Sequence, residues 1–111
     1  MRIILYGTIA DCEKASTYLA DFEINIYTHM EQLIPALIET IPDAVFVLME
    51  SAAGMEGVIA VKKVDPNLSV AWFSNDRDFA PQAYRLKTEY FATLPVSREK
   101  VISALKRCRL M

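Results

Sequence analysis

Short apolar runs alternate with longer amphipathic segments along the whole chain. The runs have the length of strands and are rich in β-branched or aromatic residues, whereas the segments between them place apolar residues three and four positions apart, as helices do. The predicted strands span 2–6, 24–28, 44–49, 68–73 and 90–94. The predicted helices span 11–22, 30–41, 55–64, 76–87 and 98–108. Five strands that alternate with five helices predict an α/β domain whose parallel sheet is covered by helices on both faces.

The most apolar of these strands lies in residues 43–57, DAVFVLMESAAGMEG. Because this strand is apolar without interruption, we place it at the centre of the sheet, buried on both faces. In open parallel sheets, ligands bind at the carboxyl ends of the strands. Here that end carries Leu48 and Met49 in place of polar groups, and a loop that contains Gly54 and Gly57 is expected to follow.

The helical spacing also predicts which side chains are buried. The apolar stripe of the first helix would include Tyr18 and Phe22, and that of the second would include Ile38 and Ile41. Ser97 directly precedes the last helix and is a good N-cap.

Composition narrows the possible classes of protein. A chain of 111 residues is long enough for one domain with a core of its own. A net charge of −2 argues against a nucleic-acid surface, which usually carries a basic excess. The apolar runs are far shorter than the roughly 20 residues that a membrane span needs, and the first residues do not resemble a signal peptide. We therefore expect a cytoplasmic protein that binds neither nucleic acid nor membrane.

The two cysteines and one histidine do not have the spacing of a metal site. We expect Cys12 and Cys108 to be free, buried thiols whose helices flank the same face of the sheet. The offset along those helices is on the order of 15 Å, which is too long for a disulfide. No metal and no cofactor are expected.

The last third of the chain, AYRLKTEYFATLPVSREKVISALKRC (83–108), resembles response regulator receiver domains, which have the CheY-like fold. Within that family it is most similar to receivers that precede LytTR-type or SARP-type DNA-binding domains. The resemblance is carried by Ala83, Tyr84 and Leu86 at a helix end, by Phe91 and Pro95, and by the closing helix from Ser97 to Cys108.

Earlier segments extend this resemblance over the full chain. PDAVFVL is similar to the start of the family's third strand, GMEG (54–57) to its Gly-Met-Asp-Gly, and AWFSND to its fourth strand, which ends in a Ser or Thr. The resemblance implies a flavodoxin-like, doubly wound (βα)5 domain with strand order 2-1-3-4-5. It also implies that residues 1–111 form one receiver-like domain, which would be the N-terminal part of a longer regulator where an output domain follows.

The positions that carry phosphotransfer in the family are changed here. The acidic pair that binds magnesium is matched by Gly7 and Thr8, and the lysine before the proline is matched by Leu94. The phosphoacceptor aspartate is matched by Leu48, or by Met49 when the count runs back from Gly54. A receiver needs clustered oxygens for Mg²⁺ and a cation for the phosphoryl charge, and these residues supply neither. The resemblance therefore predicts a pseudo-receiver that is not an enzyme.

Three polar residues near the vacated site have alternative interpretations. Asp11 and Glu50 could form a substitute metal site, and Glu50 could act as a permanent mimic of a phosphoryl charge. We favour a role for Asp11 as a helix cap or dipole partner and a solvated loop position for Glu50. Ser74 keeps the family's hydroxyl, and we expect it to bond to nearby loop backbone.

Two classes of function follow. The first is an interaction module in signal transduction or transcription regulation, which binds a partner protein or a second copy through the fourth helix, fifth strand and fifth helix. The residues expected on this surface are Tyr84, Lys87, Tyr90 and Phe91, with Arg98 and Lys106 beside them. The basic tail 106–109 is expected to complement the dipole of the last helix. The second class is a small-ligand domain that uses the vacated pocket, for which GTIAD (7–11) is a weak phosphate-loop signal.

Overall fold

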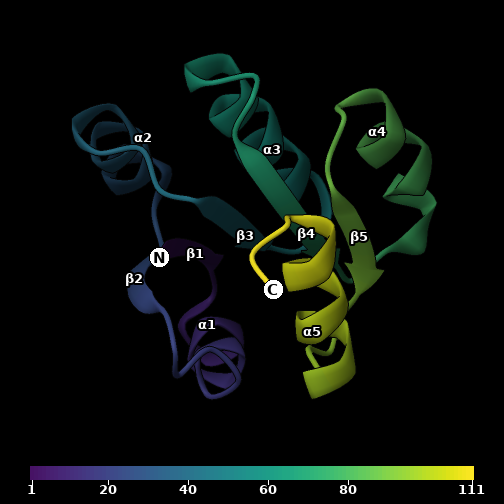
Figure 1. The fold of residues 1–111 in the computed structure, drawn as a ribbon. Coiled ribbons are helices and arrows are strands. Elements are labelled where there is room, and N and C mark those ends of the chain that lie inside the picture. Colours follow the sequence, from purple (N-terminus) through teal and green to yellow (C-terminus); the bar gives the residue numbers. More distant parts are fainter.

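The five strands form one parallel sheet in the computed structural model, which describes all residues from 1 to 111 (Figure 1). The strands are β1 (Arg2–Gly7), β2 (Glu23–Tyr27), β3 (Ala44–Leu48), β4 (Ser69–Ser74) and β5 (Tyr90–Thr93). Their order in the sheet is β2-β1-β3-β4-β5, and each neighbouring pair is parallel. The predicted fold class and strand order are confirmed.

Helices cover both faces of this sheet (Figure 1). They are α1 (Ile9–Ser16), α2 (Met30–Glu39), α3 (Ser51–Val64), α4 (Ala80–Arg85) and α5 (Arg98–Arg107), with a 3-10 turn η1 (Arg77–Phe79) before α4. Buried residues of α1 and α5 share one core cluster, whereas those of α2, α3 and α4 share the cluster on the opposite face.

Alternation along the strands divides the core between these two faces. In β3, Phe46 and Leu48 face the α1–α5 side, and Val45 and Val47 face the other. All five residues of β3 are buried, as expected for a strand with covered faces and a strand on each side. The prediction of a central, fully buried third strand is confirmed.

The first helix is shorter than predicted. It begins two residues earlier, at Ile9, and ends at Ser16 instead of residue 22. The hydroxyls of Ser16 and Thr17 donate to the carbonyls of Glu13 and Lys14 at 2.7 and 2.6 Å, which offers the backbone an alternative to a continued helix. The turn that follows buries Leu19 but leaves Tyr18 exposed, so the predicted stripe was wrong at Tyr18.

The two glycines that were expected in a loop lie inside α3. A Cβ atom on Gly54 would lie 2.6 Å from the carbonyl oxygen of Met49 and 2.8 Å from the indole nitrogen of Trp72. A Cβ atom on Gly57 would lie 2.8 Å from the ring of Tyr6. The glycines therefore allow α3 to approach the sheet closely, and the helix starts four residues before the predicted boundary.

Two other helix predictions need correction. The predicted helix 76–87 is instead the 3-10 turn η1 followed by the short α4. The carboxylate of Asp76 accepts from the Asp78 amide at 2.9 Å and caps η1, and Lys87, with a left-handed φ of 58°, lies beyond the end of α4. In α2, Ile38 is 69% exposed and Ile41, beyond the helix, is 51% exposed, so neither belongs to the core. No helix combines the length and the apolar character needed to cross a membrane.

Candidate functional site

The carboxyl edge of the sheet brings together the positions that the sequence singles out there. We call Gly7, Thr8, Leu48, Met49, Ser74 and Leu94 the carboxyl-edge site. Gly7 and Leu48 are paired residues of β1 and β3, and Leu48 is completely buried. A Cβ atom on Gly7 would collide with the carbonyl oxygen of Leu48 and lie 2.8 Å from its carbonyl carbon. The end of β1 thus has no room for a side chain.

Thr8 is the N-cap of α1. Its hydroxyl accepts from the Asp11 amide at 3.3 Å and donates to the Asp11 carboxylate at 2.9 Å. Of the two roles predicted for Asp11, helix cap or dipole partner, the cap is wrong, because Thr8 is the N-cap and Asp11 lies in the first turn. A negative charge in that turn still complements the helix dipole.

A pair of short hydrogen bonds orders the loops after β3 and β4. The buried hydroxyl of Ser74 accepts from the Asp76 amide at 3.1 Å, which confirms the predicted bond to loop backbone. The side-chain carbonyl of Asn75 accepts from the Ser51 amide at 2.8 Å, and Ser51 has a left-handed φ of 51°. Glu50, the N-cap of α3, is exposed and makes no side-chain capping bond.

Leu94 leaves the end of β5 without a charged side chain. The nearest cation along the chain with a bond to this turn is Lys100, whose ammonium donates to the carbonyls of Thr93 and Pro95 at 2.6 and 3.1 Å. Sequence reasoning did not single out Lys100, although its position three residues after the Ser97 cap places it in the first turn of α5. Because its ammonium binds two carbonyls, Lys100 is committed to the β5–α5 turn.

The donor set of the carboxyl-edge site does not fit a hard cation. Mg²⁺ prefers several oxygen ligands in octahedral geometry, and carboxylates supply its charge balance. The site instead contains three aliphatic or thioether side chains, a glycine without space for a substituent, a threonine bonded to Asp11 and a serine engaged with backbone. No three His, Cys, Asp or Glu side chains lie together as a metal site anywhere in the structure.

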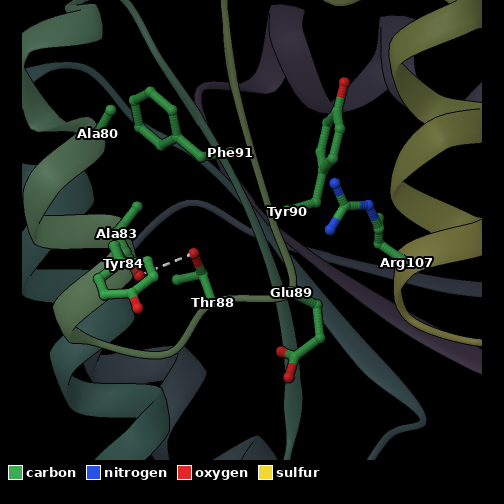
Figure 2. A pocket seen from close by; sticks show the side chains of 8 residues that line it. All are labelled: Ala80, Ala83, Tyr84, Thr88, Glu89, Tyr90, Phe91 and Arg107. Atoms are coloured by element: carbon green, nitrogen blue, oxygen red, sulfur yellow. Dashed lines mark hydrogen bonds between the residues drawn. The ribbon is translucent and has the colours of Figure 1, made fainter.

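A groove of about 250 Å³ lies at the other candidate region, along the outer strand β5. We call it the β5 groove, and Figure 2 shows the eight residues that line it. They are Ala80, Ala83, Tyr84, Thr88, Glu89, Tyr90, Phe91 and Arg107. The groove is formed by α4 on one face of the sheet, α5 on the other face and the outer strand β5 between them. It therefore lies at the edge of the sheet.

The predicted surface residues occupy different places around this groove. Tyr84 is 87% exposed on α4, and Lys87 is exposed beyond the end of that helix but does not line the groove. Tyr90 and Phe91 point to opposite faces, because Tyr90 packs on Phe73 with ring centroids 5.8 Å apart and Phe91 packs edge-on against Trp72 at 5.2 Å.

Arg98, which was expected on the same surface, lines a separate groove of about 290 Å³. That groove lies between α5 and the turn after α1, where Tyr18 and Phe22 also contribute. The structure therefore does not bring Arg98 to the β5 groove.

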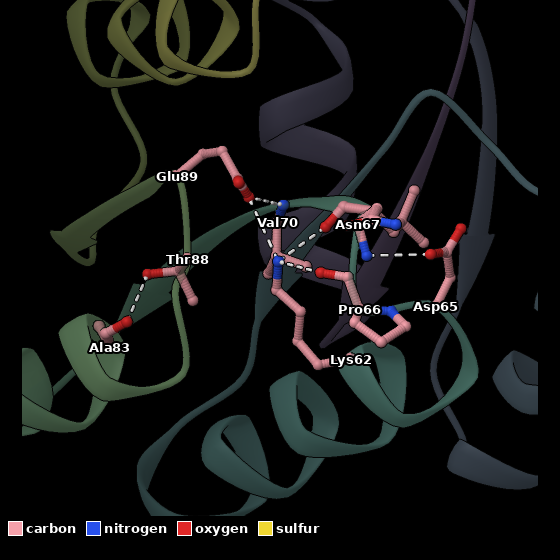
Figure 3. A network of polar contacts seen from close by, with 9 residues as sticks. Lys62, Asp65, Pro66, Asn67, Val70, Ala83, Thr88 and Glu89 are labelled. Carbon is pink, nitrogen blue, oxygen red and sulfur yellow. Dashed lines mark hydrogen bonds and ion pairs between the residues drawn. The ribbon is translucent and has the colours of Figure 1, made fainter.

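A polar network holds Thr88 and Glu89, which line the β5 groove (Figure 3). The carboxylate of Glu89 accepts from the Val70 amide at 2.7 Å and forms an ion pair with Lys62 at 3.6 Å. Lys62 also donates to the carbonyl of Leu68 at 2.8 Å, and Thr88 donates to the carbonyl of Ala83 at 3.1 Å. These bonds link α3, β4 and α4 to the two residues that precede β5.

Both cysteines are free and belong to the α1–α5 core cluster. Burial, together with the charge of Asp11, raises the pKa of Cys12 to about 12. Burial also raises the pKa of Cys108 to about 12, with a further contribution from Glu89 that Lys62 partly offsets. A thiol with so high a pKa is a poor nucleophile at neutral pH, so both residues act as core side chains.

Comparison with known proteins gives no match by sequence, since neither a protein-family model nor a curated protein matches the chain. Solved structures do match. A response regulator receiver domain protein from Clostridium thermocellum is similar with a TM-score of 0.82 and 17% identity, over 97% of this chain and 94% of that one. The chain has the fold of a response regulator receiver domain.

Two further solved structures with this receiver fold are similar over nearly the whole chain. The BeF3-activated receiver domain of DrrB gives a TM-score of 0.79 and 15% identity, over 99% of this chain and 97% of that one. NtrX from Brucella abortus, solved in complex with ATP, gives 0.80 and 20% identity over 98% of this chain. This chain spans 28% of the length of NtrX.

Arg107 is a groove residue that the sequence interpretation assigned only to the helix dipole. Figure 2 shows it extending from α5 toward β5, on the side where Tyr90 lies. A signal for it was present in the sequence as the uneven distribution of charge. Residues 77–111 carry eight Lys and Arg against three Asp and Glu, whereas residues 1–76 carry four against eleven.

Proposed function

We propose that this receiver-fold domain is a pseudo-receiver, a phosphorylation-independent interaction module in signal transduction or transcription regulation. One observation carries the proposal: the carboxyl-edge site lacks both the oxygen ligands and the free cation that phosphotransfer needs. Gly7 has no space for a carboxylate, and Leu94 stands where a charged partner for the phosphoryl group would be. Catalysis of phosphoryl transfer depends on such electrostatic stabilisation.

Burial supports Met49 over Leu48 as the counterpart of the phosphoacceptor. Leu48 is completely buried in the α1–α5 cluster, where an incoming phosphodonor has no access. Met49 is half-buried at the end of β3, on the side of the loops that carry Ser51 and Asn75. A thioether cannot accept a phosphoryl group in a stable linkage, so either assignment leads to the same function.

The geometry favours an interaction module over a small-ligand domain that uses the vacated pocket. The grooves of the structure lie along β5, between α5 and the turn after α1, and between α3 and α4, and none is lined by a carboxyl-edge residue. The exposed aromatic ring of Tyr84 and the free guanidinium of Arg107 instead lie at the β5 groove. Tyrosine and arginine are enriched among interface residues that contribute most to binding.

Intact-mass spectrometry after incubation with acetyl phosphate and Mg²⁺ tests this proposal. We expect an unchanged mass, while a phosphorylatable receiver domain treated in the same tube gains one phosphoryl group. A labile adduct on Asp11 or Glu50 would refute phosphorylation independence. The similarity to receivers of LytTR-type and SARP-type regulators remains a prediction, which the sequence of the full-length gene would test.

A further inference from the structure

Charge is strongly polarised between the two parts of this chain. Residues 77–111, which include η1, α4, β5 and α5, have eight basic and three acidic side chains and therefore a net charge of +5. Residues 1–76 have four basic and eleven acidic side chains and a net charge of −7. The overall −2 conceals this separation. The β5 groove is formed within the basic segment, and the charged residues that line it are Arg107 and Glu89.

Arg107 is the basic residue of this segment that lines the β5 groove. It is exposed, lines the groove and takes part in no ion pair, since the structure has one ion pair, between Lys62 and Glu89. Glu89, the acidic residue of the groove, already bonds to the Val70 amide and to Lys62. The guanidinium of Arg107 is thus available to a carboxylate from outside, with which arginine forms strong paired hydrogen bonds.

The backbone of β5 supplies a second kind of recognition. β5 is hydrogen-bonded to β4 on one side and has no neighbouring strand on the other. An outer strand of this kind presents unpaired N–H and C=O groups, to which an extended peptide can add as a further strand. The groove follows this edge, with the ring of Tyr84 on one flank and Arg107 on the other (Figure 2).

We propose that the β5 groove binds an extended, acidic segment of a partner protein. The segment pairs its backbone with the free edge of β5, and one of its carboxylates binds Arg107. This inference rests on the proposed interaction function and specifies the chemistry of the partner. Complementary charge raises the association rate and excludes partners of the wrong sign.

The same charges disfavour a second copy in a symmetric contact. In a two-fold contact through this surface, the Arg107 guanidinium of each copy would find no free carboxylate at the other copy's groove, because Glu89 is already bonded to the Val70 amide and paired with Lys62. Single-stranded nucleic acid shares the negative charge, but its backbone has no amide groups to pair with the edge of β5.

Selection from a displayed library of random linear peptides tests the proposal on the intact chain. Peptides selected on the wild type should be enriched in Asp and Glu, and their binding should weaken as salt is added. The Arg107→Glu variant should bind them about tenfold more weakly or worse. The control is Lys63→Glu, which makes the same charge change on an exposed residue of α3 outside every groove and should leave binding unchanged.

Several results would overturn the proposal. They are enrichment of neutral or basic peptides, equal binding by the Arg107→Glu variant, and equal loss in both variants, which would indicate long-range charge alone. Binding of a single-stranded oligonucleotide that Arg107→Glu abolishes and Lys63→Glu preserves would assign the surface to nucleic acid instead. Neutral peptides that bind at the β5 groove would leave the proposed interaction function intact. A phosphoryl adduct would refute that function without bearing on the charge of the partner.

Discussion

The carboxyl-edge site and the β5 groove lie on the same sheet but have opposite physical characters. At the carboxyl edge, buried Leu48 lies directly against Gly7, and the polar groups that remain bond to one another or to backbone. At the β5 groove, Tyr84 is almost fully exposed and Arg107 has no acidic partner. At the carboxyl edge, Ser74 and Asn75 bond to backbone within the chain, whereas at the β5 groove the guanidinium of Arg107 is free to bind a partner.

This difference indicates where the domain can respond to other molecules. A ligand shifts a conformational equilibrium only when it binds the two states unequally. The residues of the carboxyl-edge site line no groove and carry no charged side chain. Under the proposed function, selective recognition would therefore depend on the β5 groove, where a free cation and an unpaired strand edge lie together.

The largest effect is expected from the attempt to restore a carboxylate at the end of β1. In a Gly7→Asp variant the new Cβ atom would lie 2.8 Å from the carbonyl carbon and 2.9 Å from the Cβ of Leu48, so β1 and β3 must separate. Overpacking and the burial of a charge should together lower the free energy of unfolding by about 3 kcal/mol or more. Urea denaturation measures this loss.

Thr8→Asp is the matched control for that variant. Position 8 is exposed and is the N-cap of α1, where aspartate caps as well as threonine does. The bond from the Thr8 hydroxyl to the Asp11 carboxylate is lost and two carboxylates then lie close together, so stability should fall by about 1 kcal/mol, well below the loss in Gly7→Asp. A Gly7→Asp protein as stable as Thr8→Asp would show that the carboxyl edge is not closed and would remove the contrast with the β5 groove.

The two cysteines allow the burial of the core to be compared near the carboxyl edge and near the β5 groove. Cys12 lies on α1, which starts at the carboxyl edge, and Cys108 follows Arg107 of the β5 groove. Folding raises the pKa of both thiols to about 12, so above their ordinary value of about 8.5 the unfolded chain loses protons that the native chain keeps. Stability is therefore complete below that pH and should fall as the pH rises toward 12.

Urea denaturation at neutral pH and near pH ~10 measures this fall. The Cys12→Ala/Cys108→Ala variant should show a smaller pH dependence, with a remainder from Tyr6, whose pKa is raised by burial and by Glu56 and Glu31. Alkylation of either thiol in the native protein as fast as in the unfolded one would show instead that the core is open beside one of the two regions.

The sheet could be predicted from sequence because its three inner strands, β1, β3 and β4, are buried apolar runs. The edge strands β2 and β5 have no fully buried residue, but all five strands lie within one residue of their predicted limits. Helix ends were predicted less well because they depend on single bonds. Thr17 ends α1 by bonding to Lys14, and Gly54 looks like a loop residue until the helix is seen to pass against Trp72.

In the two candidate regions, too, some features could be predicted from residue identities and others depend on the fold. Identities alone indicate that Gly7, Thr8 and Leu94 supply no carboxylate and no cation. The bond between Asn75 and Ser51 depends on two loop conformations that have no sequence signature. The proposed role of Arg107 depends on the pairing of Glu89 with Lys62, two residues that only the folded chain brings together. A charge count by segment, rather than over the whole chain, would have pointed to its surroundings.

A smaller effect is expected from the bond that joins the loops of the carboxyl edge. In an Asn75→Ala variant the Ser51 amide loses its acceptor, and the left-handed conformation of Ser51 loses the contact that supports it. The free energy of unfolding should fall by about 1 kcal/mol, and hydrogen exchange at the Ser51 amide should accelerate. Asn67→Ala, in an exposed turn where the side chain makes no hydrogen bond, is the control. Equal exchange in both variants would mean that this edge is held by other contacts.

The smallest effect on stability, with the clearest effect on binding, is expected at the exposed side of the β5 groove. Tyr84 is 87% exposed, Lys87 is exposed, and neither side chain makes a hydrogen bond, so the Tyr84→Ala/Lys87→Ala variant should unfold within about 0.5 kcal/mol of the wild type. Phe91, which packs against Trp72 on the inner side, should keep its place. Binding of acidic peptides selected on the wild type should nevertheless weaken, because an aromatic flank and a positive charge are both lost.

Thermal denaturation and fluorescence anisotropy with a labelled acidic peptide measure these two quantities separately. Equal peptide affinity at equal stability would remove α4 from the binding surface and leave Arg107 and the edge of β5 to act alone. Sedimentation velocity tests the remaining alternative, a homodimer through the same surface. We expect both proteins to sediment as monomers, because a second copy offers Arg107 no free carboxylate at this surface. A wild-type dimer that the double variant dissociates would show that aromatic contacts alone hold two copies together, and the partner of this groove would then be a second copy of the chain.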